Sequence, residues 1–292
     1  MKPPPFEYIR PSTVAEAVTA MAQSEEPRIL AGGQSLMAMM NLRYVFPATL
    51  VDINDLHDLV GIDAARDRIR IGAMTRQRRI EVDPDIAALA PIFPAALRHV
   101  GHRQTRNRGT IGGSLCHLDP AAELAALVLL MDATLEVTGP AGTREVAASD
   151  FVVGYMTPGI APEEIVTAIS FAPWAAGHGS SFQEYSRRHG DFAIASAGVM
   201  LETDPEGTIT RASICIGGLG STPQRHPEGE AALVGTRGEA DGIATALDAC
   251  DALECIADFH GGPAYRMNVA RTMLRRALSE ARSGMNNGRG QA

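Results

Sequence analysis

Two short segments rich in glycine constrain this chain more than any other feature of its sequence. Residues 31–36 read Ala-Gly-Gly-Gln-Ser-Leu, and residues 109–114 read Gly-Thr-Ile-Gly-Gly-Ser. Adjacent glycines allow a backbone to adopt positive φ and to approach a ligand closely. Successive free N–H groups then form a concave anion site that suits a diphosphate. We call these stretches the first and second glycine segments, and we expect them to clamp a dinucleotide.

Each Gly-Gly pair alone is also typical of an ordinary tight turn. Neither segment has the spacing of the Rossmann or P-loop motifs, so the sequence does not support those nucleotide folds. However, Ser35, Thr110 and Ser114 place hydroxyl groups beside the glycines. Two such segments, each with a hydroxyl neighbour, favour a clamp over two unrelated turns.

The composition is that of a globular chain with no affinity for nucleic acid. Hydrophobic residues make up 45% and the net charge is −8, which argues against disorder and against a basic nucleic-acid face. No apolar run reaches about 18 residues and the N-terminus has no apolar signal core, so we expect a cytoplasmic protein without a membrane span. The four cysteines form no CxxC pair, which favours reduced thiols over an iron–sulfur cluster.

Local signals predict where several helices begin. Thr13 and Glu16 have the spacing of a capping box at the start of a helix. Asp119 followed by Pro120 is a favourable start for a second helix, whose continuous apolar sequence predicts burial. We place Glu123 in the first turn of that helix, outside the capping-box position. A carboxylate there can stabilise the helix terminus or accept hydrogen bonds from ribose or ribityl hydroxyls.

The order of these elements predicts an α+β fold with two domains. A larger domain is expected at 1–176, a smaller β-then-α domain at 177–284, and a frayed tail at 285–292. The expected strands are 28–31, 49–53, 68–73, 134–138, 165–171, 192–201 and 209–217, and the expected C-terminal helices are 241–259 and 263–282.

Four motifs in a fixed order resemble one protein family. They are similar to signatures of the FAD-binding medium subunit of molybdenum hydroxylases, the carbon monoxide dehydrogenase and xanthine dehydrogenase type. The motifs are residues 31–36 with Arg43, residues 105–114 with 119–124, residues 187–193 and residues 217–225. The resemblance implies a two-part FAD-binding domain of the vanillyl-alcohol-oxidase (PCMH) type. It also implies a small C-terminal domain of a β-sheet with helices.

The resemblance also implies a set of residues around FAD. The two glycine segments hold the diphosphate, Glu123 lies near the ribityl chain, and His117 lies near the diphosphate or ring, unless it is a structural histidine. Gln183 stands where some relatives have lysine, and Phe192 lies close to the isoalloxazine ring. The full expected cofactor set is Leu30, Ala31, Gly32, Gly33, Gln34, Ser35, Leu36, Val100, Thr110, Ile111, Gly112, Gly113, Ser114, His117, Glu123, Val166, Gln183 and Phe192.

Other polar groups near the second glycine segment have two interpretations. His102, Arg103, Arg106 and Arg108 can offset diphosphate charge or meet an acidic partner, and they can equally form a solvated face. The eight histidines are scattered without a metal-ligand spacing. We therefore expect no metal site and no catalytic residue on this chain.

By resemblance, the chain carries FAD as the electron-transfer subunit of a heterotrimer. A large molybdopterin subunit and a small [2Fe–2S] subunit are the expected partners, in a dimer of heterotrimers, and the external electron acceptor is open. One alternative is a self-contained FAD oxidase or dehydrogenase, which needs its own substrate pocket and base. Another is a flavin-free scaffold, which has no reason to keep the glycines.

Overall fold

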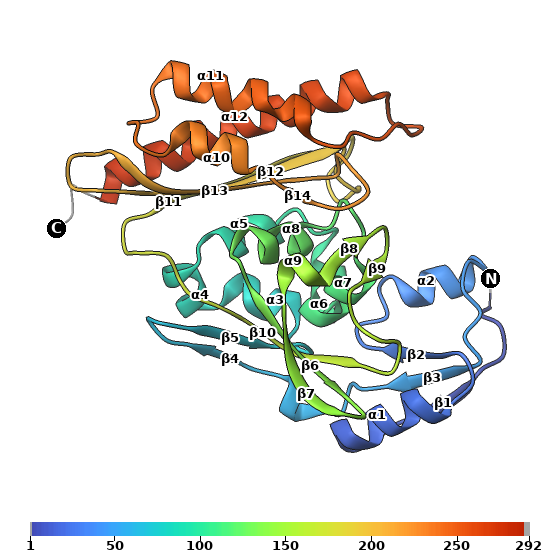
Figure 1. The fold of residues 1–292 in the computed structure, drawn as a ribbon. Coiled ribbons are helices and arrows are strands. Elements are labelled where there is room, and N and C mark those ends of the chain that lie inside the picture. Colours follow the sequence, from blue (N-terminus) through green and yellow to red (C-terminus); the bar gives the residue numbers. More distant parts are fainter. Residues whose placement is uncertain (1, 289–292) are drawn as a thin grey trace.

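The computed structural model describes residues 2–288, and these residues form an N-terminal and a C-terminal part. In the view of Figure 1 the C-terminal sheet and its helices lie above the N-terminal part. A group of helices lies between that sheet and the main N-terminal sheet. The mixture of helices and strands agrees with the expected α+β class.

A small parallel sheet, in the order β1-β3-β2, begins the N-terminal part. Helix α1 connects β1 to β2, and α2 follows the first glycine segment. The predicted helix start is confirmed, because Thr13 Oγ1 accepts a hydrogen bond from the Glu16 N–H at 3.1 Å. The Glu16 carboxylate reaches back to the Ser12 N–H at 2.7 Å. The elements are β1 (Glu7–Ile9), α1 (Val14–Gln23), β2 (Pro27–Leu30), α2 (Leu36–Asn41), β3 (Thr49–Asp52) and the short 3-10 helix His57–Leu59.

A five-stranded antiparallel sheet, in the order β4-β5-β10-β6-β7, forms the centre of the N-terminal part. Side chains alternate between its two faces, and Ile71, Leu135 and Ile169 are fully buried on the face that the helices cover. The strands are β4 (Ile62–Ala64), β5 (Ile69–Gly72), β6 (Thr134–Gly139), β7 (Gly142–Ala147) and β10 (Ile165–Phe171), and a small hairpin is formed by β8 (Val152–Gly154) and β9 (Thr157–Pro158).

Helices cover one face of this sheet, and one of them contains most of the second glycine segment, with Gly112 buried and Gly113 half-buried. Helix α8 is apolar on all sides, and its leucines are buried. Burial of each such leucine contributes about 1.5–3 kcal/mol. The helices are α3 (Gln77–Val82), α4 (Pro84–Leu89), α5 (Ile92–Leu97), α6 (Arg103–Arg108), α7 (Ile111–His117), α8 (Glu123–Leu130) and α9 (Ala148–Phe151).

Helix α8 begins later than its sequence signals predict. Asp119 Oδ1 accepts a hydrogen bond from the Ala121 N–H at 2.8 Å, which closes a turn in place of a helix cap. Ala122 is the residue at the cap, so the helix starts at Glu123. The expected start at Asp119 is therefore wrong by one turn.

The C-terminal part is an antiparallel sheet, in the order β11-β12-β13-β14, with helices on its outer face. Phe182 and Met200 point inward and join the N-terminal core, whereas Ala197 and Val199 belong to a second core under α12. The sequence did not predict β11, and the expected helix at 241–259 ends early. The elements are β11 (Gly179–Tyr185), β12 (Ala195–Thr203), β13 (Ile209–Gly217), β14 (Gln224–Arg225), α10 (Pro227–Leu233), α11 (Ala240–Asp248), the 3-10 helix Ala249–Ala252 and α12 (Pro263–Gly288).

The last helix extends into the expected tail. Helix α12 continues to Gly288, and Met285 is buried in the second core at 6% exposure. The expected fraying from residue 285 onward is therefore wrong at its first residue, because Met285 continues the apolar face of the helix. Residues 289–292 of that expected tail lie outside the described residues.

Candidate cofactor-binding site

The fold brings the two glycine segments into direct contact, although they are far apart in the sequence. A Cβ atom on Gly32 would lie 2.5 Å from the Arg108 carbonyl oxygen and 2.8 Å from Gly109 Cα. A Cβ on Gly113 would lie 3.4 Å from the Ala31 Cβ. Glycine is required at Gly32 because backbone, and not a flexible side chain, fills the space.

The first glycine segment has backbone donors available for a ligand. It leaves the end of β2, turns at Gly33 with φ +72°, and enters α2. Within the described residues, the N–H groups of residues 32–35 have no hydrogen-bond partner. Ser35 precedes α2 but does not cap it through its side chain. Consecutive free N–H groups at a turn with positive φ form a concave site for an anion.

The second glycine segment has its donors occupied. Thr110 Oγ1 accepts the Gly113 N–H at 3.1 Å, which caps α7. The Ile111 and Gly112 N–H groups donate to Thr75 and Ala73 carbonyls at 3.2 and 2.8 Å. The expectation of free N–H groups is therefore wrong here, because the Thr75 and Ala73 carbonyls and the Thr110 hydroxyl accept from donors that the start of a helix otherwise leaves without partners.

A polar bridge holds the two segments together, and sequence reasoning missed it. Arg76 donates to the Arg108 carbonyl at 2.5 Å and to Asn54 Oδ1 at 2.8 Å. Asn54 Nδ2 donates to the Ala31 carbonyl at 2.9 Å. The sequence signal that could have revealed this bridge is the position of Asn54 directly after an expected strand. Arg76 also places a positive charge beside the contact between the segments.

Helix α7 leads from the second glycine segment toward α8 and carries Cys116 and His117 near its end. Surrounding protein raises the pKa of the Cys116 thiol to about 12. Burial lowers the pKa of His117, so this histidine is neutral at pH 7.

Two acidic residues lie near the boundary between α8 and the C-terminal sheet. Glu123 is the first residue of α8, and Glu184 is on β11. Burial raises the pKa of both carboxyl groups, and the charge of Glu123 raises the pKa of Glu184 further. His99 Nδ1 lies 4.0 Å from Glu184 Oε1. Sequence reasoning missed Glu184, because β11 was not predicted.

The structure places four other expected residues outside the two glycine segments. Val166 is in β10 with 3% exposure and belongs to the hydrophobic core. Val100 is half-buried against the same core, and its carbonyl accepts a hydrogen bond from Arg106. Gln183 points away from Glu123 and bonds to Glu280 on α12. Phe192 is 68% exposed in the connection before β12.

The basic cluster before the second segment is divided. Arg106 is buried and bonds to the Glu81 carboxylate at 2.8 Å, so it is a structural ion pair and not part of a solvated face. His102 stacks on His189 with 5.9 Å between ring centroids. Arg103 and Arg108 are exposed. His102 is exposed as well, so every member of the cluster except Arg106 keeps the solvated position that the sequence allowed.

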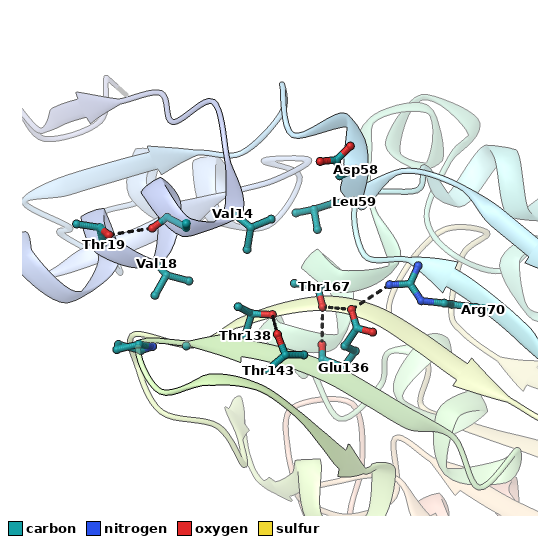
Figure 2. A pocket seen from close by; sticks show the side chains of 13 residues that line it. Val14, Val18, Thr19, Asp58, Leu59, Arg70, Glu136, Thr138, Thr143 and Thr167 are labelled. Carbon is teal, nitrogen blue, oxygen red and sulfur yellow. Dashed lines mark hydrogen bonds and ion pairs between the residues drawn. The ribbon is translucent and has the colours of Figure 1, made fainter.

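A cavity of about 520 Å³ lies on the other face of the five-stranded sheet (Figure 2). Val14 and Val18 of α1 line one side, and Arg70 and Glu136 lie on the sheet. Arg70 is paired with Glu136 at 2.9 Å, and Thr167 donates to the same carboxylate at 2.6 Å. These charges already satisfy one another, and none of the expected cofactor residues lines this cavity.

Two further findings concern residues 2–288. None of their helices combines the length and apolar character needed to span a bilayer. They also contain no group of three or more histidine, cysteine or acidic side chains arranged to hold a metal ion.

Comparisons with known proteins agree on one family. The family described as "FAD binding domain in molybdopterin dehydrogenase" matches residues 4–174, and the "CO dehydrogenase flavoprotein C-terminal domain" matches residues 180–281. The chain is 37% identical to the carbon monoxide dehydrogenase medium chain of Afipia carboxidovorans, over 97% of this chain and 99% of the relative. It is also 37% identical to the 6-hydroxypseudooxynicotine dehydrogenase complex subunit alpha of Paenarthrobacter nicotinovorans, over 96% of both chains.

A solved structure shows the same fold. A chain of carbon monoxide dehydrogenase from Hydrogenophaga pseudoflava superimposes with a TM-score of 0.94 at 34% identity, covering 97% of this chain and 99% of that one. The FAD-binding domain and the smaller C-terminal domain that the motifs implied are thus confirmed.

Proposed function

The chain belongs to the FAD-binding medium subunits of the molybdenum hydroxylase family, and from this premise we propose that it is the electron-transfer subunit of a heterotrimeric enzyme. In this proposal the chain accepts electrons from [2Fe–2S] centres on a small partner subunit and passes them to an external acceptor. A large molybdopterin subunit carries out the hydroxylation. Bound FAD supplies the redox chemistry, and the protein supplies binding, orientation and electrostatics.

The observation that carries this proposal is the set of free N–H groups in the first glycine segment. Residues 32–35 offer consecutive donors, and Gly33 turns the backbone with φ +72°. A diphosphate has the charge and oxygen acceptors that such a site binds. The positive charge of Arg76 beside the segment favours the same ligand. The residues present therefore fit FAD.

The second segment has a different role in the proposal. Its glycines allow α7 to start against the first segment, and Thr110 fixes that start by capping the helix. In this proposal the ribityl chain follows α7 toward Glu123. Phe192, exposed in the connection before β12, is proposed to cover the isoalloxazine ring.

Exposed apolar side chains support the proposal of partner subunits. Leu42, Tyr44 and Phe46 follow α2 and are 61%, 75% and 56% exposed. Large apolar groups of this kind are typical of surfaces that partners cover. We propose a dimer of heterotrimers in the cytoplasm, where the four free cysteines stay reduced.

The test is the absorption spectrum of the purified chain, followed by release and identification of the cofactor. We expect flavin bands and about one FAD per chain, as one diphosphate site predicts. A colourless chain that also fails to bind added FAD, alone and with its partners, contradicts the proposal and favours the scaffold alternative. Reduction of the flavin by a small substrate in the absence of partners favours the self-contained oxidase.

A further inference from the structure

The connection between β11 and β12 carries Phe192 and is attached to the rest of the chain at its base and near its middle. It spans residues 186–194, and the Ile194 N–H donates to the carbonyl of the last residue of β11 at 2.8 Å. Near its middle, the His189 ring stacks on His102 of the N-terminal part, with 5.9 Å between ring centroids. Both rings are exposed, so the attachment at the base is the stronger restraint on Phe192.

A buried arginine closes the base of this connection. Arg266 is in the first turn of α12 and is 3% exposed. Its Nη1 atom donates to the Ile194 carbonyl at 2.8 Å and to the Gly218 carbonyl at 2.5 Å. Its Nη2 atom donates to the Asp258 carboxylate, which supplies the opposite charge that a buried guanidinium requires. Arg266 therefore joins three segments that are far apart in the sequence.

The Gly218 segment links this base to the N-terminal part of the chain. Gly218 follows β13 with φ +71°, and its N–H donates to the Pro120 carbonyl, shortly before α8, at 2.9 Å. A Cβ on Gly218 would lie 3.0 Å from the Ala193 carbonyl oxygen, so the two segments pack backbone against backbone. These segments contain two of the four sequence motifs, residues 187–193 and 217–225, and the sequence gave no sign of their contact.

The two carbonyl groups depend on Arg266 for their hydrogen bonds. Among the described residues, no backbone N–H donates to the Ile194 or the Gly218 carbonyl. The Nε atom of Arg266 is buried without a partner in the same part of the chain, so the guanidinium is held through Nη1 and Nη2. Without the guanidinium both carbonyls lose their donor, and opening of the connection to water is then favoured.

We propose that Arg266 is a positioning residue that holds Phe192 in place over the cofactor. The proposal rests on the proposed function in one respect, the placement of Phe192 against the isoalloxazine ring. In this role the guanidinium acts through the backbone and not by contact with FAD. It binds the Ile194 and Gly218 carbonyls at the same time, so the connection stays fixed relative to the N-terminal part. The planar guanidinium suits this role because it presents several donors in a rigid fork.

The first test uses the full chain without cofactor. Trypsin cleaves after arginine where the chain opens, and Arg187 and Arg188 are exposed in the connection. Cleavage there is compared with cleavage after Arg66, which is exposed in the turn between β4 and β5. In Arg266→Met we expect this ratio to rise about 10-fold, as loss of charge-assisted hydrogen bonds from a closed segment predicts. Arg275→Met, the same substitution at an exposed position of α12, should leave the ratio unchanged.

An unchanged ratio in folded Arg266→Met overturns the proposal, and so does an equal rise in Arg275→Met. Far-ultraviolet circular dichroism establishes that the variants are folded. If Arg266→Met does not fold, Asp258→Asn takes its place, because Asp258 is partly exposed and its charge holds the guanidinium. We expect a rise of about 3-fold in Asp258→Asn. A wild-type ratio in that variant then overturns the role of Arg266.

The effect on the cofactor is measured with the FAD-loaded chain. Iodide quenches the fluorescence of a flavin that it can reach. We expect Arg266→Met and Phe192→Ala to raise the quenching constant equally, about 3-fold, and the double variant to add nothing, because both changes act through one side chain. Quenching that rises in Phe192→Ala but stays at the wild-type value in Arg266→Met overturns the positioning role.

Failure of the proposed function gives a different result. Unchanged quenching in Phe192→Ala contradicts the proposed position of Phe192, and absence of FAD from every chain contradicts FAD binding itself. In both cases the tryptic ratio still decides whether Arg266 holds the connection.

Discussion

The first and second glycine segments contain the same Gly-Gly pair, yet their backbone N–H groups have different partners. In the first segment the donors of residues 32–35 are free for a ligand. In the second, the Gly112 and Gly113 donors are taken by the Ala73 carbonyl and by Thr110 Oγ1. The comparison teaches that the same Gly-Gly pair can serve different purposes in different surroundings. One segment offers donors, and the other provides the close packing that holds those donors in place.

We expect Gly32→Ala to disrupt the contact between the two glycine segments more than any other substitution considered below. The new Cβ would lie 2.5 Å from the Arg108 oxygen, and backbone cannot move aside as a side chain can. We expect the two segments to separate, with a loss of about 3 kcal/mol in the free energy of unfolding, because overpacking against backbone is costly. FAD should fall to trace levels in the purified chain. Chemical denaturation and flavin absorbance measure the two effects.

Gly33→Ala is the matched control for this prediction. Gly33 has φ +72°, but its nearest neighbours are the flexible ends of Met37 and Leu30 side chains at 3.2 and 3.4 Å. Only backbone strain remains, at about 1 kcal/mol. Equal losses in Gly32→Ala and Gly33→Ala would show that contact between the segments is not the controlling feature.

Arg76→Met tests the polar bridge between the segments. The substitution removes hydrogen bonds to the Arg108 carbonyl and to Asn54, and it removes a positive charge beside the free donors. Removing hydrogen bonds from a charged donor, and leaving their acceptors unpaired, costs about 2 kcal/mol. We expect a loss of that size in the free energy of unfolding and a weaker affinity for FAD.

Arg79→Met serves as the control for the bridge. Arg79 is exposed on α3, one turn after Arg76, so its substitution changes the net charge equally without touching either segment. If both variants weaken FAD binding to the same degree, the effect is one of overall charge, and the bridge has no specific role.

Thr110→Ala separates packing from ligand binding in the second segment. Thr110 caps α7 through the hydrogen bond from the Gly113 N–H. Loss of such a cap costs about 1 kcal/mol. We expect a lower melting temperature in calorimetry and a comparable loss in Thr110→Ala whether or not FAD is present. Thr110→Ser keeps the hydroxyl and should retain most of the stability; if it does not, the cap is not the reason.

Local signals allowed the start of α1 to be predicted from the sequence. The capping residues Thr13 and Glu16 lie within one turn of each other, so their contact needs no distant partner. The glycine segments were recognised by composition and by their resemblance to a family. The hydrogen-bonding state of the second segment was not accessible, because it depends on carbonyl groups of residues 73–75, which only the folded chain brings near.

The face on which a strand residue lies was equally inaccessible. Gln183 and Glu184 are adjacent, and alternation in β11 sends one toward α12 and the other toward His99. Register is set by pairing along the whole strand, where Gln183 opposes Ala197 of β12. Because the sequence did not predict β11, it could not show which of Gln183 and Glu184 points toward α12. The structure was needed to decide this.

Ser35→Ala is the counterpart of Thr110→Ala and the smallest expected change in stability. Ser35 precedes α2, but its side chain makes no capping hydrogen bond, so the free energy of unfolding should change by less than about 0.5 kcal/mol. Its hydroxyl stands among the free donors, and loss of one hydrogen bond to FAD should weaken the affinity about 5-fold. Denaturation of the apo-chain and a flavin-fluorescence titration measure the two quantities. If Ser35→Ala destabilises the apo-chain as much as Thr110→Ala does, the first segment is also built for packing and the contrast between the two segments fails.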